Sequence, residues 1–222
     1  MDAGLSPEKS PRKSPFRIGL FGGSFDPPHN AHVALAQVAL TQMQLDTVLW
    51  IPTGQAWQKR SPQASAEQRA DMVALAIADE PRFVLDRREL MRSGPSYTLD
   101  TVHELQTEHA GAAFFLIIGQ DQHAGFHTWR GWQALLQSVS LAVAERPGAP
   151  VHLNDQVRQA SGHSTVALPM MDISSTEIRS RLANGLAVAD LVPTAVASYI
   201  ARHSLYSSQK PSPHPQELNG HS

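Results

Sequence analysis

The fold is decided by residues 16–36, which read FRIGLFGGSFDPPHNAHVALA. Residues 16–21 form a short apolar run that ends at a glycine pair, a pattern typical of a buried parallel strand. Residues 31–40 are rich in alanine and leucine and favour a helix. A strand, a glycine turn and a helix in this order bring backbone N–H groups and the positive end of a helix dipole to one point. The stretch therefore predicts a phosphate-binding turn.

Two histidines follow the glycine turn. His29 and His32 are three residues apart, so they lie on one face of the first helical turn and can reach the same anion. The alternative is that Asp26 and Asn30 only cap the helix and that both histidines lie on the surface. The convergence of glycines, histidines and a helix start favours the anion site.

A second motif lies at residues 173–179, which read ISSTEIR. Ser174 or Ser175 predicts a helix N-cap, and Glu177 is an acid in the first turn. The planar guanidinium of Arg179 suits a phosphate group. The sequence thus predicts a second helix N-terminus that gathers hydroxyls and N–H groups for a polyphosphate.

The two motifs resemble the signature of the nucleotidyltransferase superfamily, in which G-x-F-D-P-x-H-x-G-H precedes I-S-S-T-x-I-R. Ala31 stands where that signature usually has glycine, so we expect slightly less room beside His32. Three further segments resemble bacterial nicotinate-mononucleotide adenylyltransferases: GPSYTLDT at 94–101, GQDQHAGFHTWRGW at 119–132 and AERPG at 144–148. The resemblance spans residues 17–206.

Apolar runs predict further strands at 47–51, 83–85, 113–118, 139–144 and 166–168. Helices are predicted between them, including one from Ser65, which forms a capping box with Gln68. Strand, helix and strand in this order predict right-handed parallel βαβ units. We therefore expect an α/β fold: a Rossmann-like, open, doubly wound parallel sheet with helices on both faces.

Length and composition limit the organisation of the chain. With 222 residues, 41% hydrophobic and 17% charged, it can bury one core. We expect a disordered leader at 1–15, a single nucleotidyltransferase domain at 16–206 and a disordered tail at 207–222. The net charge of −2 does not favour a nucleic-acid partner, and the lack of cysteine excludes disulfides and thiolate metal sites.

No apolar run has the length of a membrane span, and the N-terminus lacks the apolar region of a secretory signal. We therefore expect a cytoplasmic protein without a membrane partner. Whether it forms a homo-oligomer is left open by the sequence.

The resemblance implies an enzyme of NAD biosynthesis, an adenylyltransferase that transfers AMP from ATP to nicotinate mononucleotide. Its products are nicotinate adenine dinucleotide and pyrophosphate. Mg²⁺ is expected to accompany ATP, and no dedicated metal ligand is visible. Two alternatives stay open: another acceptor, either nicotinamide mononucleotide or phosphopantetheine, or a catalytically silent nucleotide-sensing module.

Candidate site residues follow from the motifs and the resemblance. The catalytic candidates are His29, His32 and Arg179. The ATP-binding candidates are Gly22, Gly23, Ser24, Phe25, Lys59, Gly119, Asp121, Ser174, Ser175 and Thr176. The resemblance implies that nicotinate mononucleotide contacts Ser96, Tyr97, Thr98, Trp129 and Arg130, with the ring stacked on Trp129.

Other polar residues are expected on the surface. Solvated side chains are predicted for His103, His109, His123, His127 and His163. The charged cluster at residues 87–89 is interpreted as a solvated face. Ser96 or Thr98 is expected to cap the helix that follows.

Overall fold

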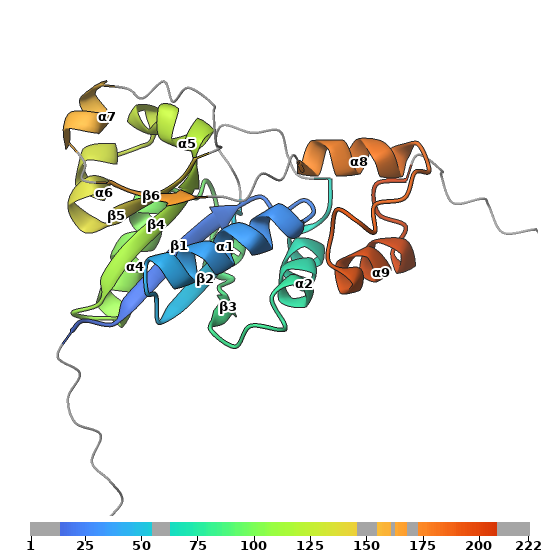
Figure 1. The fold of residues 1–222 in the computed structure, drawn as a ribbon, viewed down its shortest axis with the longest axis horizontal. Coiled ribbons are helices and arrows are strands. Elements are labelled where there is room, and N and C mark those ends of the chain that lie inside the picture. Colours follow the sequence, from blue (N-terminus) through green and yellow to red (C-terminus); the bar gives the residue numbers. More distant parts are fainter. Residues whose placement is uncertain (1–13, 55–62, 146–154, 161–162, 168–172, 208–222) are drawn as a thin grey trace, which may run out of the picture.

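The structure, a computed structural model, describes residues 14–54, 63–145, 155–160, 163–167 and 173–207 (Figure 1). Nearly all of the predicted leader and tail lies outside these residues. Within them no helix is long and apolar enough to cross a membrane.

Six parallel strands form one sheet in the described part of the chain, in the order β3-β2-β1-β4-β5-β6. Their bounds are β1 Arg17–Gly23, β2 Thr47–Pro52, β3 Phe83–Leu85, β4 Ala113–Gly119, β5 Ser140–Glu145 and β6 His163–Ala167. The strand order reverses between β1 and β4, the two central strands. Leu20 of β1 lies opposite Leu49 of β2 on one side and Leu116 of β4 on the other. The predicted doubly wound parallel sheet is confirmed.

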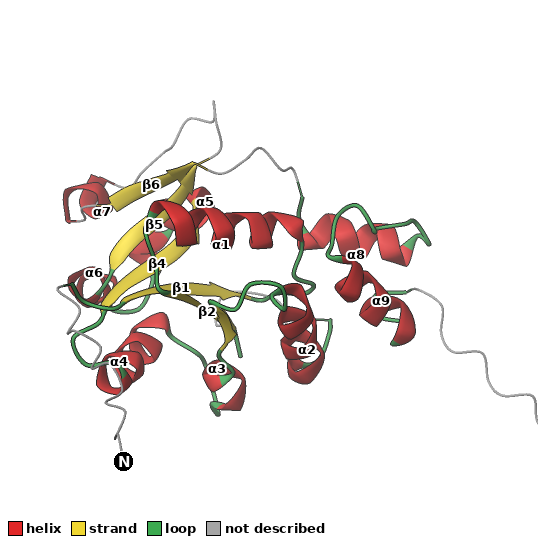
Figure 2. Ribbon diagram, turned by 60° about the horizontal axis from the view of Figure 1, so that its bottom comes forward, coloured by secondary structure: helices red, strands yellow, loops and turns green. Residues whose placement is uncertain are grey.

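Helices connect the strands, and α8 and α9 come after the last strand, β6, in the chain. Their bounds are α1 Asn30–Gln42, α2 Ala66–Ala76, α3 Arg88–Met91, α4 Thr98–Glu108, α5 Gln120–Ala124, the 3₁₀-helix η1 Phe126–Thr128, α6 Trp132–Ser138, α7 Asp155–Ala160, α8 Ser175–Ala183 and α9 Thr194–Arg202. Figure 2 shows α1 on one side of the sheet and α4 on the opposite side.

Each face of the sheet has its own apolar core. Leu40 of α1 and Val73 of α2 pack with Trp50 of β2 on one face. On the other face, Leu105 of α4 and Leu135 of α6 pack on strands β1, β4 and β5. Both faces are covered, which is why the strands read as nearly continuous apolar runs.

A third apolar cluster joins α2 to α8 and α9 at one end of the molecule (Figure 1). Met72 of α2 packs there with Ile178 of α8 and with Val196 and Ile200 of α9. Because Ile178 lies one turn into the ISSTEIR helix, this cluster fixes that motif relative to the sheet.

Some local predictions hold and others do not. The capping box is confirmed: the Gln68 N–H donates to Ser65 Oγ over 3.2 Å, and the Ser65 N–H donates to Gln68 Oε1 over 2.9 Å. The predicted cap of α4 is wrong, because Tyr97 occupies the N-cap position and its side chain makes no capping hydrogen bond.

The expected surface positions of the polar residues also divide. His103, His109 and His127 are exposed, but His123 is buried, with 1% of its surface accessible. The prediction of a solvated face at residues 87–89 is wrong for Glu89, which is also buried. The side chain of His163 is not among those described. Burial of His123 and Glu89 follows from long-range packing that no local pattern reports.

Candidate active site

A cavity of about 400 Å³ opens at the carboxyl ends of the central strands. Open α/β sheets bind ligands at this edge, where the strand order reverses. Its walls come from the turn after β1, the start of α4, and the segment from α5 to residue 130. It brings together the predicted residues Gly22, Gly23, Ser24, Ser96, Tyr97, Thr98, Asp121, Trp129 and Arg130.

One wall of the cavity carries aromatic rings. Trp129 is half-buried, and the buried ring of Phe126 packs beside it with the ring centroids 5.0 Å apart. The guanidinium carbon of Arg130 lies 4.5 Å from the centroid of the Tyr97 ring, at the distance of a cation–π contact. The wall therefore combines a flat apolar surface with a positive charge. Trp132, by contrast, packs against the core and does not line the cavity.

The two candidate histidines form a stacked pair beside this cavity. Their ring centroids are 3.6 Å apart, and the backbone N–H of His29 donates to Nδ1 of His32 over 3.2 Å. An Nδ1 that accepts a hydrogen bond places the proton of neutral His32 on Nε2. Burial lowers the pKa of His29 to about 4, so His29 is neutral at physiological pH.

The Phe25 ring packs against the glycine turn that precedes the histidines. It is buried and contacts the His32 ring edge-on, with the centroids 5.2 Å apart. A Cβ atom on Gly23 would lie 3.0 Å from the Phe25 ring, closer than most Cβ contacts, so a larger residue there would have to shift this ring. The side chain of Phe25 therefore supports His32, and only its backbone can serve a ligand.

Asp26 links the turn to distant parts of the chain. Its buried carboxylate accepts hydrogen bonds from the backbone N–H of Gln63 over 2.8 Å, the N–H of Ala64 over 3.1 Å and the hydroxyl of Tyr206 over 2.7 Å. The alternative in which Asp26 only caps the first helix is therefore wrong, because His29 is the N-cap residue of α1. The DPP motif was a signal for Asp26, whereas nothing in the sequence pointed to Tyr206.

Arg69 is another residue that sequence analysis missed. The residue is buried, with 2% of its surface accessible, and Nη1 donates to the carbonyl oxygen of Ser24 over 2.8 Å. Burial lowers the pKa of Arg69, while the charge of Asp26 raises it. Arg69 therefore fixes the glycine turn from the α2 side.

The second motif meets the first directly. Ser175 Oγ donates to the carbonyl oxygen of Pro27 over 2.9 Å, and Arg179 Nη1 donates to that of Asp26 over 2.8 Å. Arg179 Nη2 also donates to Thr176 Oγ1 over 3.2 Å. Ser174 caps α8, because its Oγ accepts the N–H of Glu177 over 3.1 Å. The starts of α1 and α8 thus lie together, as the motif pair predicted.

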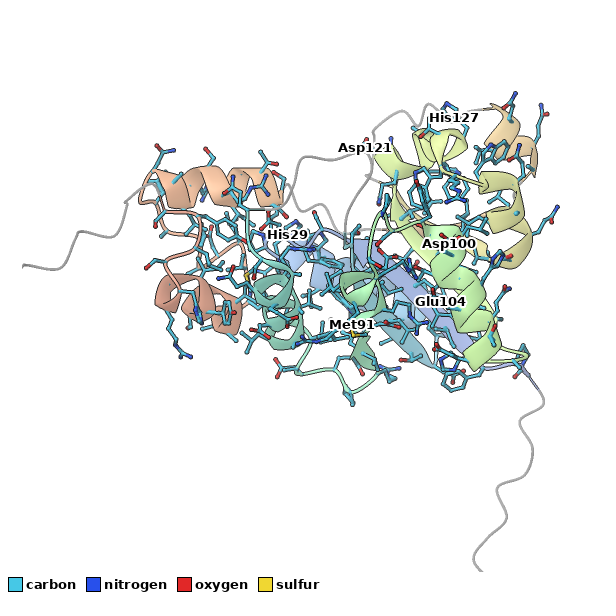
Figure 3. All side chains as sticks on the ribbon, turned by 180° about the vertical axis from the view of Figure 1, so that it is seen from behind. His29, Met91, Asp100, Glu104, Asp121 and His127 are labelled. Carbon is cyan, nitrogen blue, oxygen red and sulfur yellow. The ribbon has the colours of Figure 1, made fainter. Side chains whose placement is uncertain are left out.

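The candidate residues therefore fall into two adjoining groups. Figure 3 shows His29 where α1 begins and Asp121 on the segment that follows β4. His29, His32 and Arg179 lie outside the lining of the cavity. Gly119 also lies outside it, and its N–H donates to Gln122 Oε1 over 3.1 Å. Lys59 lies outside the described residues.

Comparisons with known proteins identify the family and the fold of the chain. The model of the cytidylyltransferase-like family matches residues 20–181. A chain in a solved structure of Plasmodium falciparum nicotinic acid mononucleotide adenylyltransferase, complexed with NaAD, has the same fold. It superposes with a TM-score of 0.71 at 19% identity, over 86% of this chain and 97% of that one. Fold and site together define a nucleotidyltransferase.

Curated relatives identify the family within the nucleotidyltransferases. A probable nicotinate-nucleotide adenylyltransferase of Methylibium petroleiphilum is 49% identical over 197 residues, which cover 86% of this chain and 92% of that protein. A probable enzyme of the same name from Bordetella petrii is 47% identical over 195 residues, 86% of this chain and 98% of that protein. This chain belongs to the nicotinate-nucleotide adenylyltransferase family.

Proposed function

We propose that the cavity binds nicotinate mononucleotide and that the adjoining starts of α1 and α8 bind the triphosphate of ATP. As a member of its family, the protein is an adenylyltransferase of NAD biosynthesis, which transfers AMP to that acceptor. The observation that carries this assignment is the direct contact of the two motifs beside a cavity walled by Trp129.

The reaction asks for positioning and charge neutralisation rather than covalent chemistry by the protein. A phosphate oxygen of the acceptor forms a bond to the α-phosphorus of ATP, and the bond from that phosphorus to the leaving pyrophosphate breaks. We assign His32 as the main donor to the charge that develops, through the proton on Nε2. His29 provides the second contact to the α- and β-phosphates.

The start of α8 is assigned to the β- and γ-phosphates. Ser174 and Ser175 stand at its N-terminus, where unpaired N–H groups attract anions. Thr176 and Arg179 are added from the same helix, and Arg179 is oriented by its bond to Asp26. Lys59 is assigned to the same phosphates from the sequence alone.

Mg²⁺ is assigned to ATP rather than to a protein cage. The Asp26 carboxylate is occupied by three hydrogen bonds, and no cluster of three or more His, Asp or Glu side chains suited to a metal occurs among the described residues. The described side chains therefore fit a Mg²⁺ ion that is held by phosphate oxygens and water rather than by protein ligands. When bound, Mg²⁺ would neutralise phosphate charge.

The cavity is assigned to the acceptor by its shape and charge. The nicotinate ring would stack on Trp129, and its carboxylate would meet the N–H groups near Ser96, Tyr97 and Thr98. Arg130 adds a charge contact that nicotinamide could not use. We assign the turn at 22–24, Phe25, Gly119 and Asp121 to ATP binding.

Phosphopantetheine fits this cavity less well as an acceptor, because it has no ring to stack on Trp129. A cytoplasmic location is part of this proposal.

The testing experiment measures pyrophosphate release from ATP and Mg²⁺ with nicotinate mononucleotide, nicotinamide mononucleotide or phosphopantetheine. Release with the nicotinate compound alone is expected. Release that is equal for the first two would remove Arg130 and Thr98 from acceptor selection. Release with none of the three would favour the nucleotide-sensing alternative.

A further inference from the structure

A buried carboxyl group lies in the wall of the acceptor cavity. Glu89 of α3 is 7% exposed and lines the cavity together with Ser96 and Thr98. The hydroxyl of Thr101, in the first turn of α4, donates to Glu89 Oε1 over 2.8 Å. Neither motif includes Glu89, and none of the roles assigned so far uses it.

Three segments of the cavity wall meet at this residue. The hydroxyl of Ser96 donates to the Glu89 carbonyl oxygen over a long 3.5 Å. From the β2 side, a Cβ atom on Gly54 would lie only 2.1 Å from the same oxygen, so the chain approaches so closely that only glycine fits. Glu89 therefore contacts the segment after β2 and the start of α4 from its place on α3.

The charges around Glu89 come from several elements. Arg92 donates to Thr101 Oγ1 over 3.2 Å and pairs with Glu104 over 2.8 Å. Arg88 pairs with Asp86 and Glu108. Across the cavity the charged lining residues are Asp121 and Arg130. Arg88 and Arg92 are thus paired with other carboxylates, and Arg130 lies over the Tyr97 ring.

Burial is the largest influence on the acidity of Glu89. It raises the pKa, and the charges of Asp86 and Glu104 act in the same direction. The Thr101 hydrogen bond and the charge of Arg92 act against this shift, and the pKa of Glu89 remains raised overall.

We propose that Glu89 is a positioning residue for the acceptor, which fixes the first turn of α4 through Thr101 and whose ionisation weakens acceptor binding. This proposal rests on the proposed function, because it assumes an acceptor that carries a carboxylate. An ionised Glu89 would place a second negative charge in the same poorly solvated cavity. Binding of the acceptor therefore favours the neutral form.

The test measures the KM for nicotinate mononucleotide, the KM for ATP and kcat from about pH 6 to about pH 9, where a raised carboxyl pKa can show. The variants are Glu89→Gln, Glu89→Ala and the control Glu108→Gln, which changes an exposed, ion-paired glutamate of α4. Glutamine stays neutral at every pH and still accepts the Thr101 bond, whereas alanine is also neutral but cannot accept that bond.

The parent is expected to show an acceptor KM that rises toward alkaline pH relative to that of Glu89→Gln. Glu89→Ala should raise the acceptor KM about tenfold above that of Glu89→Gln at every pH and leave the KM for ATP unchanged, because the Thr101 bond is lost. Thr101→Val should raise the acceptor KM by a similar factor above that of the parent, and the Glu89→Ala/Thr101→Val double variant should show no higher acceptor KM than Glu89→Ala. Glu108→Gln should follow the parent.

Identical pH profiles for the parent and Glu89→Gln would overturn the proposal. So would a Glu89→Ala variant in which both KM values and kcat change together with a lower melting temperature. Calorimetric measurement of nicotinate mononucleotide binding without ATP distinguishes failure of the proposed function from failure of the role given to Glu89. A parent that binds it but forms no product contradicts the proposed function alone, and the same comparison of affinities then decides the role of Glu89. A parent that does not bind it overturns both.

Discussion

At the scale of single residues, His29 influences both the tautomer and the charge environment of His32. The backbone N–H of His29 fixes the tautomer of His32, and the buried His29 ring stacks on the His32 ring without carrying a charge. Two positive rings at this distance would repel, so a neutral His29 is compatible with the anion contact proposed for His32. The spacing in the sequence predicted the pair but not its stacking.

His32→Ala is expected to reduce turnover at least about a hundredfold, because it removes the donor to the developing charge. The free energy of unfolding should change little, since His32 is only half-buried. Pyrophosphate release and urea unfolding measure the two effects. The control is His103→Ala, at an exposed position of α4. Near-normal turnover would remove His32 from the mechanism.

His29 predicts a dependence of stability on pH. The unfolded chain protonates His29 near its ordinary pKa of 6.5, whereas the native protein does so only near 4. The free energy of unfolding should therefore fall as the pH drops from 6.5 to 4, and this residue contributes on the order of 3 kcal/mol to the fall. Urea unfolding of the parent and of His29→Asn across this range measures it. Parallel curves would contradict the assigned shift.

The sequence indicated which residues lie together where a motif was contiguous, and their roles stay a prediction. The glycine turn, the histidines and Arg179 lie in two short stretches, and the fold brings those stretches together. Prediction from the sequence failed for Glu89, Arg69 and His123, because their burial depends on elements that are distant in the chain. A charged residue in an irregular stretch reads as solvated until its neighbours are known.

At the scale of elements, the strands were predictable because both sheet faces are covered. Strands β1 to β5 contain apolar runs, and the bounds of β3 agree with the expected residues 83–85. The sequence of β6, HSTVA, begins with polar residues, and the strand starts three residues before the expected 166–168. The short helices α3 and α5 gave no comparable periodicity, since four or five residues complete little more than one turn. Predicted helix starts were correct where a side chain made the cap, as in α2 and α8.

Ser65→Ala tests the capping box of α2. Loss of the cap should lower the free energy of unfolding by about 1 kcal/mol, because one N–H of the first turn loses its acceptor. The kinetic constants should stay the same, since Ser65 does not line the cavity. Urea unfolding measures the loss. Ser198→Ala, an exposed position within α9, is the matched control and should cost nothing comparable. Equal effects would show that the cap contributes no stability.

At the scale of the whole molecule, two tyrosine hydroxyls connect the C-terminal part to the rest. Tyr206 donates to Asp26 over 2.7 Å, and Tyr199 donates to Asp71 over 2.9 Å. The Asp26 side chain is 5% exposed, whereas that of Asp71 is 46% exposed. Burial beside the Asp26 carboxylate raises the pKa of Tyr206, so its hydroxyl stays protonated and donates.

Tyr206→Phe should lower the free energy of unfolding by about 1–3 kcal/mol, because a buried carboxylate loses one of its donors. Tyr199→Phe is the matched control. It removes the same hydroxyl from an exposed carboxylate, where water replaces the bond, and should cost less than about 1 kcal/mol. Chemical unfolding of both variants compares them, and equal losses would contradict the role given to burial.

The bond between Tyr206 and Asp26 spans 180 positions of the chain. During synthesis, the glycine turn and the histidine helix leave the ribosome well before Tyr206, their partner 180 positions later. The turn therefore cannot reach its finished form until residue 206 has been made. Nascent chains that stop before residue 206 should lack a fully tied glycine turn, so they are not expected to compete as working enzyme.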